Sequence, residues 1–106
     1  MAHKLLLKNL ESKRAFKRLC GGSRDEPGMR CGLVILKSGK SVGSHCAHGK
    51  EEALILLRGK AKIFCGKKSL IARAGAFVYI PENAVHDVKN AGRGALKYIY
   101  VTSRIK

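Results

Sequence analysis

Three of the four histidines and four of the seven acidic residues lie in two short segments of this chain, residues 39–59 and 75–90. His45, His48 and Glu52 stand close together in the first segment, and His86 lies in the second. Imidazole nitrogens and one carboxylate form a favourable ligand set for a divalent transition metal. Residues from separate strands converge when those strands line one barrel interior. The clustering therefore predicts a single metal-binding site.

The elements that must position these residues are short strands. Turn signals built on glycine, proline or asparagine separate the strand-like runs at fairly regular spacing, which favours a sandwich or barrel over βαβ units. A chain of 106 residues has room for one domain. We predict an all-β domain over residues 31–106 after an N-terminal extension over residues 1–30. The expected strands cover residues 32–37, 53–57, 61–64, 69–72, 76–80 and 95–101.

The extension itself carries two open alternatives. Leu5, Leu6, Leu7 and Leu10 are expected to form a strand laid on a sheet edge, and residues 20–28 a loop. Residues 11–19 fit either a second strand or a short basic helix.

The second histidine segment has a recognisable pattern of fixed spacing. Gly75, Pro81, His86 and Asn90 match the second motif of the cupin superfamily, and the segment departs from that motif only where Asn83 replaces a glycine. This departure is small because asparagine also tolerates positive φ. The chain thus resembles the small conserved-barrel, RmlC-like cupins.

The first segment resembles the other cupin motif less closely. Gly39, His45, Glu52 and Gly59 fit, but the family's second histidine is expected at position 47. The histidine is displaced by one residue, which leaves two alternatives.

A bulge or turn near Gly49 would direct both His45 and His48 inward. An unbroken strand would instead place Cys46 with His48 on one face. We prefer the first alternative, in which Cys46 is a pocket residue or substitute ligand.

The resemblance implies a single-domain cupin β-barrel, or jelly roll, that forms a homodimer. It implies one divalent transition metal (Fe, Mn, Ni, Zn or Cu) and a small anionic molecule, such as a sugar acid, sugar phosphate or carboxylate, as substrate. Isomerase or dioxygenase chemistry is expected, with a non-catalytic sugar-binding or ligand-binding module as the alternative. The catalytic residues stay unspecified. The implied ligands are His45, His48, Glu52 and His86, and the implied structural positions are Gly39, Gly59, Gly75, Pro81 and Asn90.

The charge balance points to an anionic partner. The chain has 22 lysines and arginines against 7 acids, a net charge of +15. Such a charge steers anions toward a protein, and we expect Lys50, Lys60 and Lys62 to contribute. Nucleic acid has only this charge in its favour, because the aromatic residues follow no RNA-binding pattern.

The four cysteines and the apolar runs suggest an ordinary intracellular protein. Cys20, Cys31, Cys46 and Cys65 form no C-x-x-C pair, so we expect free thiols rather than a zinc site or disulfide. No apolar run approaches the roughly 18 residues needed to cross a bilayer, and no signal peptide is evident. We expect a cytoplasmic location and no membrane contact.

Overall fold

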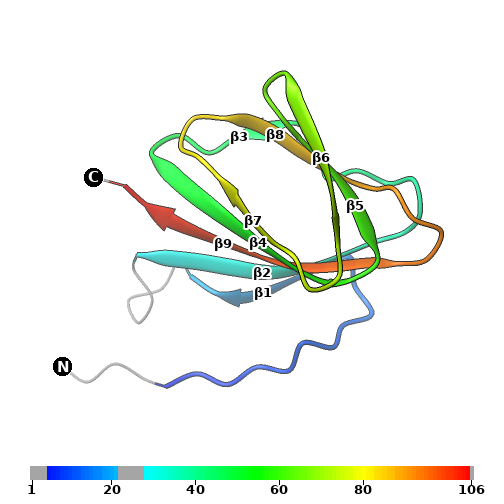
Figure 1. Ribbon diagram of the computed structural model, residues 1–106. Coiled ribbons are helices and arrows are strands. Elements are labelled where there is room, and N and C mark those ends of the chain that lie inside the picture. Colours follow the sequence, from blue (N-terminus) through cyan, green and yellow to red (C-terminus); the bar gives the residue numbers. More distant parts are fainter. Residues whose placement is uncertain (1–4, 22–27, 106) are drawn as a thin grey trace.

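The protein is a two-sheet β structure. The computed structural model describes residues 5–21 and 28–105, and in these residues the regular structure consists of nine strands. Figure 1 shows the two sheets facing each other as the two sides of a flattened barrel. The strands are β1 (Phe16–Cys20), β2 (Met29–Leu36), β3 (His45–Cys46), β4 (Lys50–Arg58), β5 (Lys60–Cys65), β6 (Lys68–Arg73), β7 (Phe77–Ile80), β8 (Val85–Asn90) and β9 (Leu96–Arg104).

All recorded strand pairings are antiparallel. The first sheet has five strands in the order β1-β2-β9-β4-β7, and the second has four in the order β3-β8-β5-β6. Strands that follow each other in sequence often belong to different sheets. The strand β4 pairs with β7 and β9, whereas its sequence neighbours β3 and β5 lie in the other sheet. This topology is a jelly roll, so the predicted all-β single domain is confirmed.

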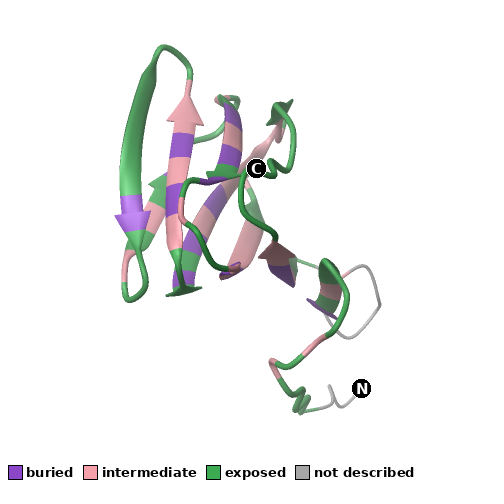
Figure 2. Ribbon diagram, turned by 90° about the vertical axis from the view of Figure 1, so that its right-hand side faces the viewer, coloured by how far each residue is buried: buried purple, intermediate pink, exposed green. Residues whose placement is uncertain are grey.

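The core lies between the two sheets. Alternate residues of each strand point inward, which gives the bands of buried and exposed residues in Figure 2. Leu54 and Leu56 of β4 meet Ile63 of β5 and Val88 of β8 there, and all four are almost fully buried. These apolar side chains form the core between the sheets.

The N-terminal segment departs from the expected edge strand of leucines. Residues 5–15 contain no strand, and Leu5 and Leu7 are fully exposed. The sheet edge is taken by β1, so residues 11–19 are neither one helix nor one strand. In Figure 1 the segment before β1 runs along the outer side of β1 and β2. The loop expected over residues 20–28 lies mostly outside the described residues.

Two strands that carry histidines did not figure among the expected ones. They are β3, which is only two residues long, and β8, which begins at Val85. The strand β8 alternates exposed residues with buried His86, Val88 and Asn90. Its inward face is therefore partly polar, which hides the usual hydrophobic alternation. Among the described residues no helix has the length and apolar character needed to cross a membrane.

Candidate metal centre

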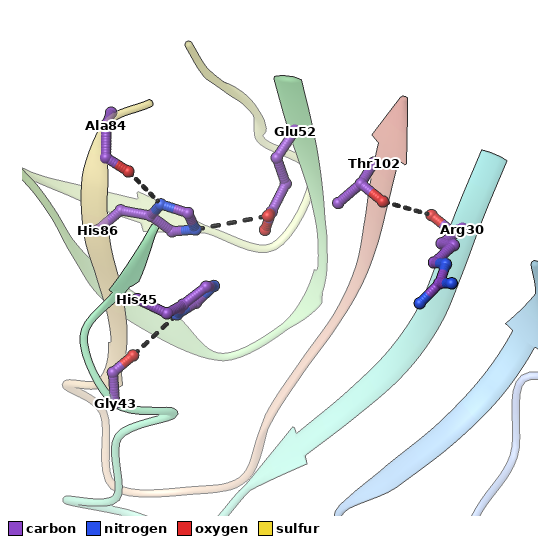
Figure 3. Close-up of polar contacts among 7 residues, drawn as sticks. All are labelled: Arg30, Gly43, His45, Glu52, Ala84, His86 and Thr102. Atoms are coloured by element: carbon purple, nitrogen blue, oxygen red, sulfur yellow. Dashed lines mark hydrogen bonds and ion pairs between the residues drawn. The ribbon is translucent and has the colours of Figure 1, made fainter. Parts of the chain in front are cut away.

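Three potential metal ligands converge inside the barrel. His45 of β3, Glu52 of β4 and His86 of β8 each offer one ligand atom, and these atoms all lie within 4.8 Å of one another. His45 is directly opposite His86 in the register of β3 and β8, so both side chains leave the same face of that sheet. Glu52 faces them from the other sheet (Figure 3).

A backbone carbonyl fixes the ring of His86. Its Nδ1 lies 3.0 Å from the carbonyl oxygen of Ala84. A carbonyl only accepts hydrogen bonds, so Nδ1 carries a proton, and in the neutral ring the lone pair is on Nε2. That Nε2 lies 3.4 Å from Oε1 of Glu52, and the ring is 2% exposed.

The same arrangement recurs at His45. Its Nδ1 donates to the carbonyl of Gly43 over 2.9 Å, which leaves Nε2 as the ligand atom. The Gly43 N–H in turn donates to Oδ1 of Asp87 over 2.9 Å. Asp87 therefore holds the turn that orients His45. Fixing the second ring nitrogen in this way is how proteins orient metal-binding histidines.

Glu52 is a buried carboxyl group. It is 8% exposed. Burial raises its pKa above the usual value, and the attraction of His86 and His45 offsets this effect only in part. The ionised Glu52 carboxylate is therefore poorly solvated in this site.

This donor set fits a divalent metal. The Nε2 of His86 is a buried nitrogen that has no hydrogen-bond partner in the described structure. A buried polar atom without a partner calls for an explanation, and a bound metal ion would provide one. Its 3.4 Å distance to Glu52 is close to that between two ligands of a tetrahedral ion with bonds of about 2.1 Å.

His48 lies outside this group. The chain turns between β3 and β4, where Gly49 has a φ of 70°. The Nδ1 of His48 lies 3.9 Å from Sγ of Cys46. His48 is exposed. The structure therefore brings together three of the four predicted ligands. The chain turns near Gly49 as the preferred alternative expects, but this turn does not direct His48 inward. Ala47, where the family pattern expects a histidine, lines the cavity beside His45.

A cavity of about 370 Å³ opens beside His45 and Glu52. Two cationic residues line it, Arg30 of β2 and Lys50 of β4, and Glu52 is the one acid in its lining. Figure 3 shows Arg30 on the strand next to Thr102, whose hydroxyl lies 3.5 Å from the Arg30 carbonyl. The sequence pattern did not single out Arg30, because it lies outside both motifs. Lys60 and Lys62 do not line this cavity.

Part of the cavity wall is aromatic. Tyr98 and Tyr100 of β9 line it together with Phe16 of β1. Phe16 stacks on Tyr100 with ring centroids 6.1 Å apart. This close stacking needs Gly32, because a Cβ there would lie 2.6 Å from the Tyr100 ring. Burial raises the pKa of both tyrosines, so their hydroxyls stay protonated and are available as hydrogen-bond donors.

The other residues of the two cupin motifs stabilise turns between the strands. Asn90 is 1% exposed, and its side-chain amide donates to the carbonyls of Leu36 and Gly94 and accepts from the Gly92 N–H. Positive φ angles occur at Gly39, Gly59, Gly75 and Asn83, the last in the turn after Pro81.

The chain belongs to the cupin family. Its sequence matches the family described as "Cupin domain" over residues 32–102, which is about two thirds of the chain. Among curated proteins it is similar to mannose-1-phosphate guanylyltransferase 2 of Escherichia coli O157:H7, with 33% identity over 70 residues. It is also similar to mannose-1-phosphate guanylyltransferase RfbM of Salmonella typhimurium, with 28% identity over 75 residues. The matches cover 66% and 71% of this chain but only 14% and 15% of those proteins.

Solved structures show the same fold. The TT1209 protein of Thermus thermophilus has a TM-score of 0.80 at 18% identity and covers 96% of this chain and 100% of its own. An RmlC-like cupin of Methanocaldococcus jannaschii has 0.79 at 17% identity, with coverage of 98% and 93%. A putative sugar phosphate isomerase of Acidithiobacillus ferrooxidans has 0.66 at 27% identity, with coverage of 74% and 52%.

Proposed function

We propose that this chain is a metal-dependent cupin enzyme whose metal is held by His45, Glu52 and His86. The observation that carries the proposal is the pair of imidazoles whose Nδ1 atoms are tied to backbone carbonyls and whose Nε2 atoms converge with a buried carboxylate. Two histidines, one carboxylate and open positions are the ligand set of many non-haem iron enzymes. When bound, such a metal polarises a substrate oxygen or binds O₂.

The substrate that this cavity fits is a small anion. Arg30 and Lys50 line it, and an arginine offers a bidentate fork to a carboxylate or phosphate. The protonated hydroxyls of Tyr98 and Tyr100 can donate to sugar hydroxyls or a carbonyl oxygen. The relative called a putative sugar phosphate isomerase supports a sugar phosphate and isomerase chemistry over a dioxygenase reaction.

Single-residue variants test the ligand assignment by calorimetric titration with Zn²⁺ and Mn²⁺. We expect His45→Ala and His86→Ala each to weaken binding by about 10-fold or more. His48→Ala should change little, as should Cys46→Ser. Binding that survives both His45→Ala and His86→Ala would refute the site, and a site emptied by Cys46→Ser would restore the unbroken-strand alternative.

Binding without turnover is the alternative activity, and one measurement separates the two. A metal-loaded chain that binds a sugar phosphate in the cavity but converts none in a panel of sugar phosphates and carboxylates would be a ligand-binding module. The enzyme proposal predicts conversion that disappears in His86→Ala.

A second candidate partner is a nucleic acid on the outer face of the four-stranded sheet. Lys60 lies opposite Arg73, and Lys62 lies opposite Lys89, in the registers of β5 with β6 and β8. Like charges in directly opposite positions are destabilising, and in the described residues no lysine or arginine nitrogen is recorded within 4.0 Å of a carboxylate. An anionic polymer would relieve this repulsion. Single-stranded RNA should then bind with steep salt dependence, and Lys62→Glu should weaken it.

We also propose that the protein forms a homodimer. Ile55 and Leu57 of β4 are partly exposed on the outer face of the five-stranded sheet, and Phe77 and Tyr79 of β7 are 67% and 54% exposed. A group of apolar side chains of this kind marks an interaction surface.

A further inference from the structure

Two cysteines face each other across the first hairpin. Cys20 at the end of β1 is directly opposite Cys31 of β2, and the register shifts between Arg18 and Cys20. The two Sγ atoms lie 2.8 Å apart. A disulfide bond measures about 2.05 Å, so the sulfurs need to approach by only about 0.8 Å to become bonded. Directly opposite positions in an antiparallel pair supply the short Cβ separation that this needs.

The other two cysteines have no such arrangement. Cys46 of β3 pairs with Val85 of β8, and Cys65 of β5 pairs with His86 of β8. They therefore flank β8 on opposite sides, at about twice the 4.8 Å strand spacing. Cysteines that far apart cannot be bridged without backbone movement. The fold thus singles out Cys20 and Cys31 as the pair poised for bond formation.

Both thiols can be reached from outside the barrel. Each cysteine is partly exposed. They line a cavity of about 350 Å³ together with Leu6, Leu10 and Leu19. This cavity is distinct from the one beside the candidate metal ligands, which neither cysteine lines. A small reagent therefore has access to the sulfurs without entering the metal site.

We propose that Cys20 and Cys31 form a reversible disulfide that locks β1 against β2. One thiolate attacks a low-molecular-weight disulfide, forms a mixed disulfide and releases one small thiol. The second cysteine thiolate then attacks the protein sulfur of that mixed disulfide, and the second small thiol leaves. Overall the protein loses two protons and two electrons, and the small disulfide is reduced to two thiols.

The bond would fasten one edge of the five-stranded sheet. β1 is an edge strand that pairs with β2 alone. Together these two strands supply Phe16 and Arg30 to the wall of the ligand cavity, and Arg30 is the neighbour of Cys31 in sequence. A crosslink at this place holds that wall in position, and it limits the unfolded chain by closing the loop between residues 20 and 31.

The test uses the full chain with Cys46 and Cys65 replaced by serine, kept metal-free by a chelator. After equilibration in buffers of increasing ratio of oxidised to reduced glutathione, we expect a monomeric species about 2 Da lighter than the reduced chain. Its melting temperature should lie roughly 5 to 15 °C above that of the reduced form. The matched control, Cys20→Ser with Cys31→Ser, should melt at one temperature in all buffers.

Three results would overturn the proposal. These are two free thiols in every buffer, stable glutathione adducts on both cysteines, and crosslinks only between chains. A disulfide that forms without raising the melting temperature would refute the lock. Peptide mapping of the wild-type chain under the same buffers gives the same decision if the serine variant does not fold. None of these readouts depends on the metal or on enzyme activity.

Discussion

Replacement of Glu52 by glutamine should act in opposite directions on folding and on metal binding. In the metal-free protein the Glu52 side chain is 8% exposed, and its Oε1 lies 3.4 Å from the His86 Nε2. When the His86 ring is neutral, two acceptors face each other in a poorly solvated place. The amide of a glutamine has the same shape, carries no charge and can donate an N–H to that nitrogen, so Glu52→Gln should stabilise the metal-free fold.

The size of the effect follows from the two changes. A new buried hydrogen bond contributes about 0.5–1.5 kcal/mol, and removal of the buried charge adds to this. A net gain of about 1–2 kcal/mol corresponds to a rise in melting temperature of roughly 5–12 °C for a chain of this size. The same substitution removes an anionic ligand, so metal affinity should fall by about 10-fold or more.

The effect of Glu52→Gln on stability should depend on pH. Because burial raises the pKa of Glu52 above 4.5 in the fold, the folded state retains a proton that the unfolded state has lost. The stability that this proton provides is present below about pH 4.5 and is lost as the pH rises through the folded pKa. The advantage of Glu52→Gln should therefore be small at pH 4 and grow toward pH 8.

Thermal unfolding in chelator-treated buffers from pH 4 to 8 measures this difference, and calorimetry measures metal affinity. Glu52→Asp is a control that keeps the charge and shortens the side chain. A glutamine variant that is less stable than the wild type at pH 8 without metal would refute the reasoning. So would unchanged metal affinity.

Three further substitutions test other parts of the structure. Ala47→His should tighten Zn²⁺ binding by about 10-fold or more, and unchanged affinity in a titration would show that this position does not face the site. Arg30→Ala should weaken sugar phosphate binding by about 10-fold and flatten its salt dependence, whereas Lys62→Ala, on the outer face, should not. Phe77→Glu should convert the dimer to a monomer in light scattering, and a monomeric wild-type chain would contradict the homodimer.

The regular part of the fold was predictable because its strands are apolar and bounded by turns. The runs that became β4 and β5 have buried aliphatic residues at alternate positions, the signal on which strand prediction depends. The strand β8 lacked this signal, since its inward face includes His86 and Asn90. The buried polar residues that give β8 its place in the candidate site are also the reason for its weak strand pattern.

The candidate site was predictable in composition and less so in geometry. His86 and Glu52 follow from motif spacing, but the choice between His45, Cys46 and His48 depended on the backbone path through Gly49. A turn at a positive φ there is a local detail that strand parity does not anticipate. Arg30 comes from a strand far from both motifs, and only the β2–β9 pairing brings it to the cavity.

The metal content of the protein as purified tests the central claim most directly. The chain should be produced without an affinity tag that binds metal and without chelator, and then analysed by mass spectrometry of the elements alongside His86→Ala. We expect about one divalent metal per wild-type chain and almost none in the variant. Less than about a tenth of a metal per wild-type chain, even after incubation with Mn, Fe, Ni, Cu and Zn in turn, would contradict the metal centre.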